Sequence, residues 1–452
     1  MTDLTKTPEK LTCRRSLALA AVLGCMPFAQ ASEQSESNGF IEDSHLGIHF
    51  RNAYWSQNND RGARDTQVWS QGVFAKFESG FTQGKVGFGV DAIGKWAVRL
   101  SGGTGHAGAS ESERLMGGMF ALDNSPNSKG LRSPKDSYSY GGGAFKMRYS
   151  NTTIKVGDIM PELPVVAYDH IRTLPGSFSG TLITSREIKG LEINAAHFTA
   201  QNGAPYSSHD AENLDSLNVL GGHYDVSDNL GTSLYFSKMK DRVSRRYADL
   251  NYRMPFSGDR SLTSKFTIYR SKFDRDFVES YTASDGKPGL KESRTNTIWS
   301  LQETYAFGPH AVTLGYQQNT GDEGYVYDIG DGPGAITVGN SYHSDYNLKH
   351  EKSLKLGYDL DFAHYGVPGL TWNSAYIYAW DVDTNGRTVD PVKTDSRANE
   401  KEFYNQVTYV VQSGRAKDLS LRARNSLYRT DSANGSNTME WRLYIDYPLN
   451  IL

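Results

Sequence analysis

Cationic side chains occur at alternate positions in two short stretches of this chain. Lys146 and Arg148 alternate with aromatic and other apolar residues, and so do Arg422 and Arg424. Guanidinium groups hold carboxylates through paired, charge-assisted hydrogen bonds. Cations spaced along a water-filled path pass an anion onward, provided that each one binds weakly enough to release it. This spacing predicts a path that attracts small carboxylates.

β-Strands are the elements that must position these cations. Successive side chains of a strand point to opposite faces, so both cations of each pair share one face and apolar residues occupy the other. Any single cation either binds solute or pairs with an interior acid to stiffen the wall. The acids Asp359, Asp361 and Glu440 occupy the polar faces of similar segments. There they either attract an amino group or balance the cations.

A proline-interrupted segment follows the strand that carries Lys146. Pro161, Pro164 and Pro175 lack the N–H group of a central strand. Apolar and charged residues are mixed here, which indicates a loop that packs inside the molecule. We expect residues 158–180 to form the narrowest part of a pore. The candidate site residues of this loop are Asp158, Asp169, His170 and Arg172, of which Asp158 is better suited to holding the loop than to contacting solute.

No spaced motif supports catalysis or cofactor binding. Asp169, His170 and Ser177 are not ordered by a nucleophile elbow, and the 11 histidines lack metal-ligand spacing. The three glycines at 141–143 are followed by neither the lysine–serine pair nor the helix of a phosphate loop. We interpret them as relieving crowding at a strand bend. The net charge of -3 argues against nucleic-acid binding.

Residues 1–31 have the features of an export signal. Basic residues precede an apolar run from Leu17 to Phe28, and Ala29-Gln30-Ala31 forms a cleavage site. Both cysteines, Cys13 and Cys25, lie within this segment. The mature chain is therefore expected to contain no disulfide and no thiolate metal site.

Alternating segments of about ten residues, the size of a tilted membrane-crossing strand, recur through the rest of the chain. No apolar run beyond residue 31 approaches the ~18 residues of a spanning helix. Short turns such as 227–229 alternate with long loops such as 319–342. We predict an all-β, transmembrane antiparallel β-barrel over residues 32–452, which begins with a loose polar lead-in at 32–43. A soluble β-sandwich or propeller is the alternative, but it would bury the recurring cations in a dry core at high cost.

The chain resembles the OprD-type family of substrate-specific bacterial outer-membrane porins. The similar segments include Phe50-Arg51-Asn52-Ala53-Tyr54 and Leu421-Arg422-Ala423-Arg424. The others lie at 140–150, 155–158, 163–165, 363–371, 409–414 and 442–449. The resemblance implies a barrel of 18 strands with an infolded third loop, in which a ladder of cations guides carboxylates past facing acids.

The resemblance assigns ladder-like strand positions to Arg51, Lys146, Arg148, Arg422, Arg424 and Arg442. Lys355 joins them through its place on the polar face of its own segment, and Arg172 matches an arginine of the family's third loop. Thr408 departs from the pattern, because some members carry a lysine there. The sequence of the loop at 168–172 does not clearly match any one substrate subgroup of the family, so it leaves the solute open.

The predicted function is passive, substrate-selective diffusion of amino acids, aromatic acids or short organic acids across the bacterial outer membrane. The expected partners are these carboxylate solutes, outer-membrane lipid and lipopolysaccharide, and the barrel assembly machinery, with no nucleic acid and no cofactor. We expect a monomer or a weak trimer. The alternative is a non-transport barrel, either an adhesin that uses the long loops or a membrane enzyme.

Overall fold

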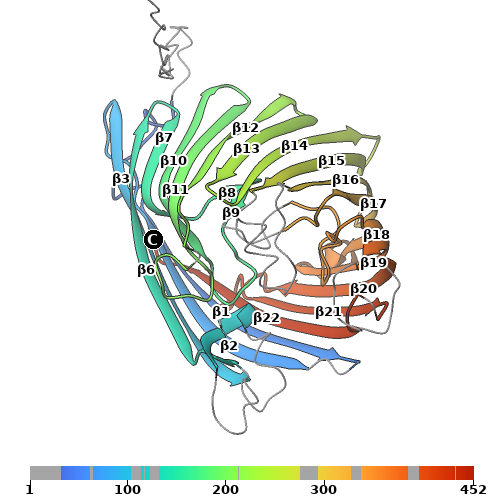
Figure 1. The fold of residues 1–452 in the computed structure, drawn as a ribbon. Coiled ribbons are helices and arrows are strands. Elements are labelled where there is room, and N and C mark those ends of the chain that lie inside the picture. The colour runs from blue at the N-terminus through green and yellow to red at the C-terminus, as the bar shows by residue number, and fades with distance from the viewer. Residues whose placement is uncertain are drawn as a thin grey trace, which may run out of the picture.

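Eighteen antiparallel strands form one closed sheet in the computed structural model of the chain (Figure 1). The structure describes residues 32–61, 65–102, 113–116, 118–122, 132–211, 213–274, 294–326, 337–384, 397–432 and 434–452, so the predicted signal peptide lies outside the described residues. The barrel strands are β1 (His45–Asn59), β2 (Thr66–Glu78), β3 (Val86–Gly102), β6 (Ser137–Tyr149), β7 (Thr152–Ile159), β10 (Ser177–Ile188), β11 (Leu191–Asn202), β12 (Leu217–Ser227), β13 (Leu230–Met239), β14 (Val243–Pro255), β15 (Arg260–Phe273), β16 (Arg294–Phe307), β17 (His310–Gly321), β18 (Lys352–Asp361), β19 (Leu370–Asp383), β20 (Arg397–Val410), β21 (Ser420–Thr430) and β22 (Thr438–Asn450).

The pairing of the first strand with the last closes the barrel. Phe50 of β1 lies opposite Val73 of β2 on one side and opposite Tyr447 of β22 on the other. A closed ring leaves no strand edge unpaired, which hydrocarbon surroundings require. The predicted 18-stranded barrel is confirmed.

The two ends of the barrel differ in the length of their connections. Turns of two residues, such as 189–190 and 308–309, join strands at one end. Gly190 and Gly308 have φ angles of 75° and 58°, which tight hairpins of this kind need. At the other end, the third loop (160–176) joins β7 to β10 and the seventh loop (322–351) joins β17 to β18. Short periplasmic turns and longer external loops are typical of outer-membrane barrels.

The remaining elements are short and lie in the connections. They are α1 (Glu113–Met116), β4 (Gly118–Leu122), β5 (Arg132–Pro134), β8 (Glu162–Leu163), β9 (Val166–Ala167) and the 3-10 helix η1 (Phe362–Tyr365). None of the helices within the described ranges is long and apolar enough to span a membrane.

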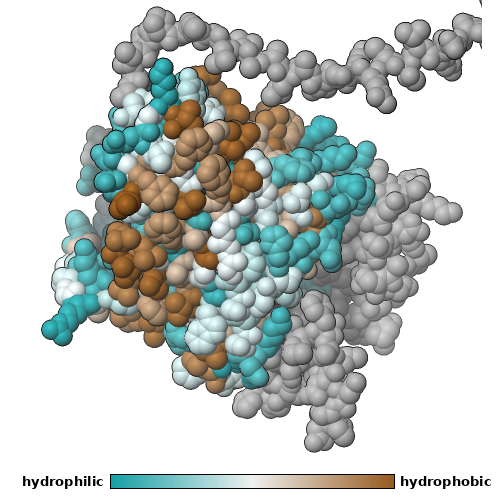
Figure 2. All heavy atoms as spheres, turned by 90° about the vertical axis from the view of Figure 1, so that its left-hand side faces the viewer, coloured by the Kyte–Doolittle hydropathy of each residue, from teal (hydrophilic) through white to brown (hydrophobic). Residues whose placement is uncertain are grey.

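Apolar side chains cover the outer wall. Leu220, Leu314 and Leu356, on three different strands, are each 58% exposed. Leucines are usually among the most buried residues, so these positions face lipid. Figure 2 shows the band on the side of β3 and β6, where brown side chains are bordered by hydrophilic ones.

Aromatic rings lie on both sides of the apolar band. Towards the long loops, the centres of neighbouring rings are 5.2–6.4 Å apart among Phe266, Trp299, Tyr316 and Trp380. Towards the short turns, a second belt contains Phe256, Tyr305, Phe307, Tyr358 and Trp372. Aromatic belts mark the two interfaces of a membrane, so the band between them is the part that crosses it.

The lead-in ahead of β1 is packed rather than loose, contrary to the expectation from its polar sequence. Gln34 is only 3% exposed, and its Nε2 donates to the carbonyl oxygens of Thr82 (2.9 Å) and Gly84 (3.1 Å). Its backbone N–H donates to the carbonyl of Ser150 at 3.1 Å. Composition alone did not indicate these contacts, because they depend on space at the turns that the barrel brings together.

The third loop folds into the barrel, as predicted, and Figure 1 shows its strands β8 and β9 inside the ring. Val165 and Val166 are fully buried. The carbonyl oxygen of Pro164 accepts a hydrogen bond from the Tyr269 hydroxyl of β15 at 2.8 Å. At the other end of the loop, Lys95 of β3 donates to the carbonyl oxygen of Pro175 at 2.9 Å. The loop therefore reaches strands on different sides of the lumen.

Candidate functional site

Four arginines gather on the inner faces of β1, β21 and β22, and we call them the arginine strip. Arg424 lies directly opposite Arg442 in the register of β21 and β22. Arg422 lies two positions nearer the short turns, and Arg51 enters from β1, opposite Asp446. Side chains directly opposite on one face have Cβ atoms ~4.5–5.5 Å apart, so these cations form one continuous surface.

A buried carboxylate balances Arg442. Its Nε donates to Glu440 Oε1 at 2.6 Å, and its guanidinium carbon lies 3.5 Å from the centre of the Trp55 ring. Glu440 is fully buried and also accepts from Trp55 Nε1 (3.0 Å) and Gln57 Nε2 (2.7 Å). Glu440, a predicted acid of the lumen face, thus lies inside a hydrogen-bonded network of the wall.

Arg51 and Arg422 share the carboxylate of Asp446. Arg51 Nε donates to Asp446 Oδ1 at 2.6 Å, and Arg422 Nη2 lies 3.6 Å from Oδ2. Arg51 Nη1 also donates to the carbonyl oxygens of His170 (3.0 Å) and Arg172 (2.9 Å). Arg51 therefore fastens the third loop to the wall, whereas the side chain of Arg422, 34% exposed, remains open to the lumen.

Arg424 differs from the other members of the strip. Among the described residues it makes no hydrogen bond or ion pair, and its Nε and Nη2 are buried without a partner. Its guanidinium carbon lies 4.9 Å from the centre of the Tyr404 ring. Buried donors without acceptors are costly, and the opposed Arg442 adds repulsion between like charges. A bound carboxylate would relieve both costs.

Lys355 faces the strip from β18. Its Nζ donates to Gln302 Oε1 (2.7 Å) and to the carbonyl oxygen of Gly339 (3.0 Å), and it lies 5.7 Å from the centre of the Tyr342 ring. That ring in turn lies 4.4 Å from the ring of Tyr404, which also contacts Arg424. Two aromatic rings therefore connect Lys355 with the strip.

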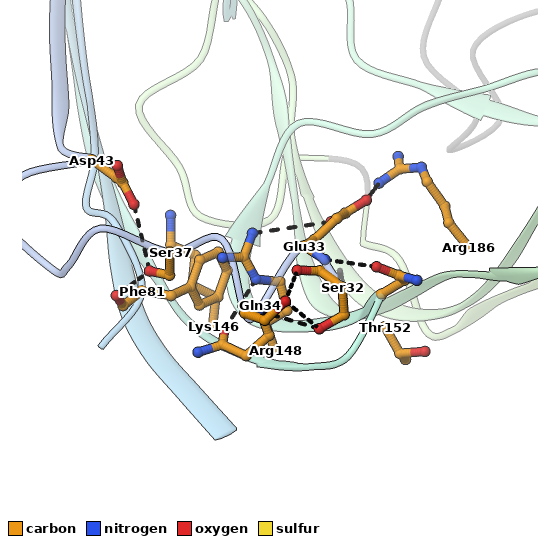
Figure 3. A network of polar contacts seen from close by, with 12 residues as sticks. Ser32, Glu33, Gln34, Ser37, Asp43, Phe81, Lys146, Arg148, Thr152 and Arg186 are labelled. Carbon is orange, nitrogen blue, oxygen red and sulfur yellow. Dashed lines mark hydrogen bonds and ion pairs between the residues drawn. The ribbon is translucent and has the colours of Figure 1, made fainter. Parts of the chain in front are cut away.

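Lys146 and Arg148 form a separate group near the short turns (Figure 3). Lys146 Nζ pairs with Asp91 Oδ1 at 2.6 Å. Arg148 Nε donates to Gln34 Oε1 at 3.1 Å, and its guanidinium carbon lies 4.1 Å from the centre of the Phe81 ring. The N-terminal segment thus occupies Arg148, and the structure does not bring either residue together with the arginine strip.

The candidate residues of the third loop mostly hold its shape. Asp169 is buried and accepts from Arg172 Nε at 3.0 Å. The exposed side chain of His170 stands 5.9 Å from the ring of Tyr168, centre to centre. Burial, assisted by the Glu162 carboxylate, raises the pKa of the Tyr168 hydroxyl to about 12, which keeps it protonated.

Asp158 holds the beginning of the third loop. It accepts hydrogen bonds from the Tyr140 hydroxyl (3.0 Å), the Gly143 N–H (3.1 Å) and the Ser179 hydroxyl. A Cβ atom at Gly142 would lie 2.5 Å from Asp158 Oδ2, so a glycine there leaves room for this carboxylate. Close packing against Asp158 therefore explains why one position of the 141–143 run is a glycine.

The other two predicted acids lie near the short turns. Asp359 accepts from Asn373 Nδ2 at 2.5 Å. Asp361 is the last residue of β18 and accepts from the Ala363 N–H at 2.8 Å, which caps η1. In the strand register, Asp359 begins an inner row that continues through Asn373, Gln406, Arg424 and Arg442. One lateral row thus carries an acid at one end and two arginines at the other.

The seventh loop also reaches the arginine strip, which was not predicted. His343 Nδ1 lies 3.0 Å from Glu440 Oε2, and the His343 N–H donates to Glu402 Oε1 at 3.0 Å. Tyr346 donates its hydroxyl proton to Glu402 Oε2 at 3.0 Å. Glu400 and Glu402 alternate on the inner face of β20, and this spacing was the available signal that something must cover them.

No group of three or more metal-ligating side chains occurs within the described ranges. The interior instead presents guanidinium groups next to aromatic rings, beside a loop that crosses the lumen. A closed antiparallel barrel with an apolar outer band, two aromatic belts and a charged lumen is a channel of the bacterial outer membrane.

Comparisons with known proteins agree with this class. The sequence profile of the family described as outer membrane porin, OprD family, matches residues 38–451. Porin D of Pseudomonas aeruginosa is 36% identical, over 97% of this chain and 98% of that protein. The crystal structure of Acinetobacter baumannii OccAB1 superposes with a TM-score of 0.83 at 39% identity, over 93% of this chain and 100% of the other. The crystal structure of Pseudomonas aeruginosa OpdK with vanillate superposes with a TM-score of 0.74 at 26% identity, over 91% of this chain and 100% of the other.

The chain belongs to the OprD family of outer membrane porins. It is a substrate-selective channel of the outer membrane, as the sequence predicted, and the members of its family are channels.

Proposed function

We propose that the channel conducts small organic solutes that carry a carboxylate, and that Arg424 is the principal carboxylate-binding residue of the arginine strip. The two buried nitrogens of Arg424 that lack a partner carry this proposal. A carboxylate loses water on entering a narrow path, and a guanidinium edge replaces that water with two parallel hydrogen bonds.

The neighbouring Arg422 provides a second binding position for the solute along the path. Arg422 lies two residues from Arg424 on the same face, about 6.6 Å away at ~3.3 Å per residue. Its charge is only partly balanced, since Asp446 lies at 3.6 Å and also binds Arg51 more closely. A carboxylate therefore engages Arg422 before it has fully left Arg424.

The third loop narrows the path opposite this strip. It is tied to Arg51 through two backbone carbonyl groups, and His170 is exposed next to those ties. The related OpdK has been crystallised with vanillate, which is a carboxylate. An aromatic or short organic acid is the solute class that we favour here.

A conductance measurement distinguishes a transport channel from a barrel with a non-transport role. A transport channel conducts when purified protein is inserted into a planar bilayer, whereas an adhesin or enzyme with a filled lumen does not. We infer that transport is its activity and that it has no catalytic role. Cleavage of residues 1–31, insertion by the barrel assembly machinery and a monomeric or weakly trimeric state remain predictions.

Liposome uptake of benzoate and of its neutral analogue benzamide tests the solute class. The parental channel should favour benzoate, and Arg422→Ala/Arg424→Ala should reduce this preference about tenfold or more, because charge-assisted contacts contribute ~1.5–3 kcal/mol each. Folding should be unaffected, since lumen positions tune selectivity more than stability. Equal uptake ratios in the two channels would refute the proposal.

A further inference from the structure

Four cations stand on the outer wall of β13, β14 and β15, at the end of the barrel that carries the long loops. They are Lys238, Arg246, Arg270 and Lys272, and all four are exposed. Their positions alternate with buried, inward-facing residues such as Met239 and Phe273, so the cations point away from the lumen. They are therefore separate from the solute path.

The strand register brings these four residues into one patch. Lys238 and Lys272 lie on either side of Ser244, and Arg246 lies directly opposite Arg270. The patch measures roughly 10 Å by 7 Å, from a strand spacing of ~4.8 Å and a rise of ~3.3 Å per residue. We call it the outer cationic patch.

The positive charge of the outer cationic patch is not balanced within the part of the chain that the structure describes. None of its four residues makes a hydrogen bond or an ion pair there. The nearby Asp215 is engaged by Lys240, with its Oδ2 2.5 Å from the ammonium nitrogen. Like charges directly opposite on a sheet destabilise it, as do cations facing lipid. An anion from outside the chain would remove both costs.

The level of the patch in the membrane identifies the kind of anion. The register row next to Arg246 and Arg270, towards the middle of the barrel, contains the outward-facing residues Leu234, Ala248, Ile268 and Trp299, which are all apolar. The cations therefore begin two residues along the strand, or ~6.6 Å, beyond the apolar band on the side of the long loops. Because the long loops are external, this is the headgroup level of the outer leaflet.

We propose that the outer cationic patch binds the phosphate groups of lipopolysaccharide, the glycolipid of the outer leaflet. Arg246 and Arg270 present planar forks that match phosphate oxygens, and the two lysines add point charges at the edge. One lipid molecule can place its phosphates on the patch and its acyl chains on Leu234 and Ile268. A free phosphate ion has no apolar part that could contact this adjoining surface, so we assign the site to the lipid.

Native mass spectrometry of the detergent-solubilised barrel with added diphosphoryl lipid A tests the proposal. Arg246→Gln/Arg270→Gln should bind it at least about tenfold more weakly than the parental protein, since two strong charge-assisted contacts are lost. The matched control is Arg253→Gln/Arg260→Gln, which removes the same charge from the short-turn end of the same hairpin and should bind as the parent does. Heat-modifiable electrophoretic mobility verifies folding, and Lys238→Gln/Lys272→Gln replaces the first variant if that one fails to fold.

The probes also distinguish the sources of the phosphate. Dephosphorylated lipid A should bind the parental protein about as weakly as diphosphoryl lipid A binds the double variant. Equal binding of the two lipids by the parental protein, or full competition by inorganic phosphate at the lipid's own concentration, would overturn the assignment. Unchanged binding by Arg246→Gln/Arg270→Gln would do the same.

Discussion

Single residues of the arginine strip have different tasks, which follow from the carboxylates around them. Arg442 is locked by Glu440 at 2.6 Å and by the Trp55 ring, so it shapes the wall. Arg51 donates hydrogen bonds both to Asp446 and to a backbone carbonyl oxygen of the third loop. Arg424 lacks such a partner among the described residues, and we therefore place the binding of solute there.

The pair of Glu440 and Arg442 gives a prediction about stability. Glu440→Ala should lower the free energy of unfolding by about 3–5 kcal/mol, because it leaves a buried guanidinium charge unpaired. Urea titration of the refolded barrel in lipid vesicles measures this loss. Glu440→Ala/Arg442→Met should recover most of it, since the charge is then absent. A loss below about 1 kcal/mol, the value of an exposed pair, would contradict this account of the wall.

At the scale of elements, the sequence predicted the strands and their inner faces but not the contacts across the lumen. The alternation in 419–428 predicted that Arg422 and Arg424 face inward, and Leu421 is indeed exposed outward, at 42%. His343 and Glu440 are 97 residues apart, and no local pattern indicates that they meet. Such contacts follow from closure of the barrel, which brings distant strands to one lumen.

The third loop depends on a lysine that the sequence did not single out. Lys95 Nζ donates to the carbonyl oxygens of Pro175 (2.9 Å), Gly203 (3.3 Å) and Ala204 (3.0 Å). Lys95→Met should leave these groups without their donor and loosen the loop. Single-channel recording should then show a higher conductance and more current noise than in the parental channel. Lys76→Met, another inward lysine, is the control, and identical traces for Lys95→Met and the parent would show that the loop is held elsewhere.

At the scale of the whole molecule, the N-terminal segment joins the short-turn end of the barrel. A Cβ atom at Gly80 would lie 2.0 Å from the carbonyl oxygen of Gly39, so a glycine permits this close approach. Glu33 adds an ion pair to Arg186 at 3.5 Å (Figure 3). The polar composition of the segment predicted a loose lead-in, because composition does not report the shape of the surface on which it lies.

Docking of this segment should depend on pH through Asp43. Hydrogen bonds from Asn38 hold the pKa of the Asp43 carboxyl below its usual value of 3.8. A depressed folded-state pKa contributes stability that is complete above the unfolded value and is lost as the pH falls through the folded one. A spin label on Glu36→Cys reports the mobility of the segment, since residues 32–452 contain no cysteine. We expect an immobilised spectrum at neutral pH and a mobile one once the pH has fallen well below 3.8, with most of this change absent in Asp43→Asn. Equal mobility at both pH values would contradict the prediction.

If Arg424 holds the passing carboxylate, the dwell time of single benzoate blockades measures this binding most directly. In planar-bilayer recordings, Arg424→Gln should shorten the dwell time about tenfold relative to the parental channel, as expected for the loss of one charge-assisted contact. Benzamide events should be unchanged, and Arg429→Gln, on the outer face of the same strand, should behave as the parent does. Benzoate dwell times that are the same in Arg424→Gln and the parental channel would contradict the account.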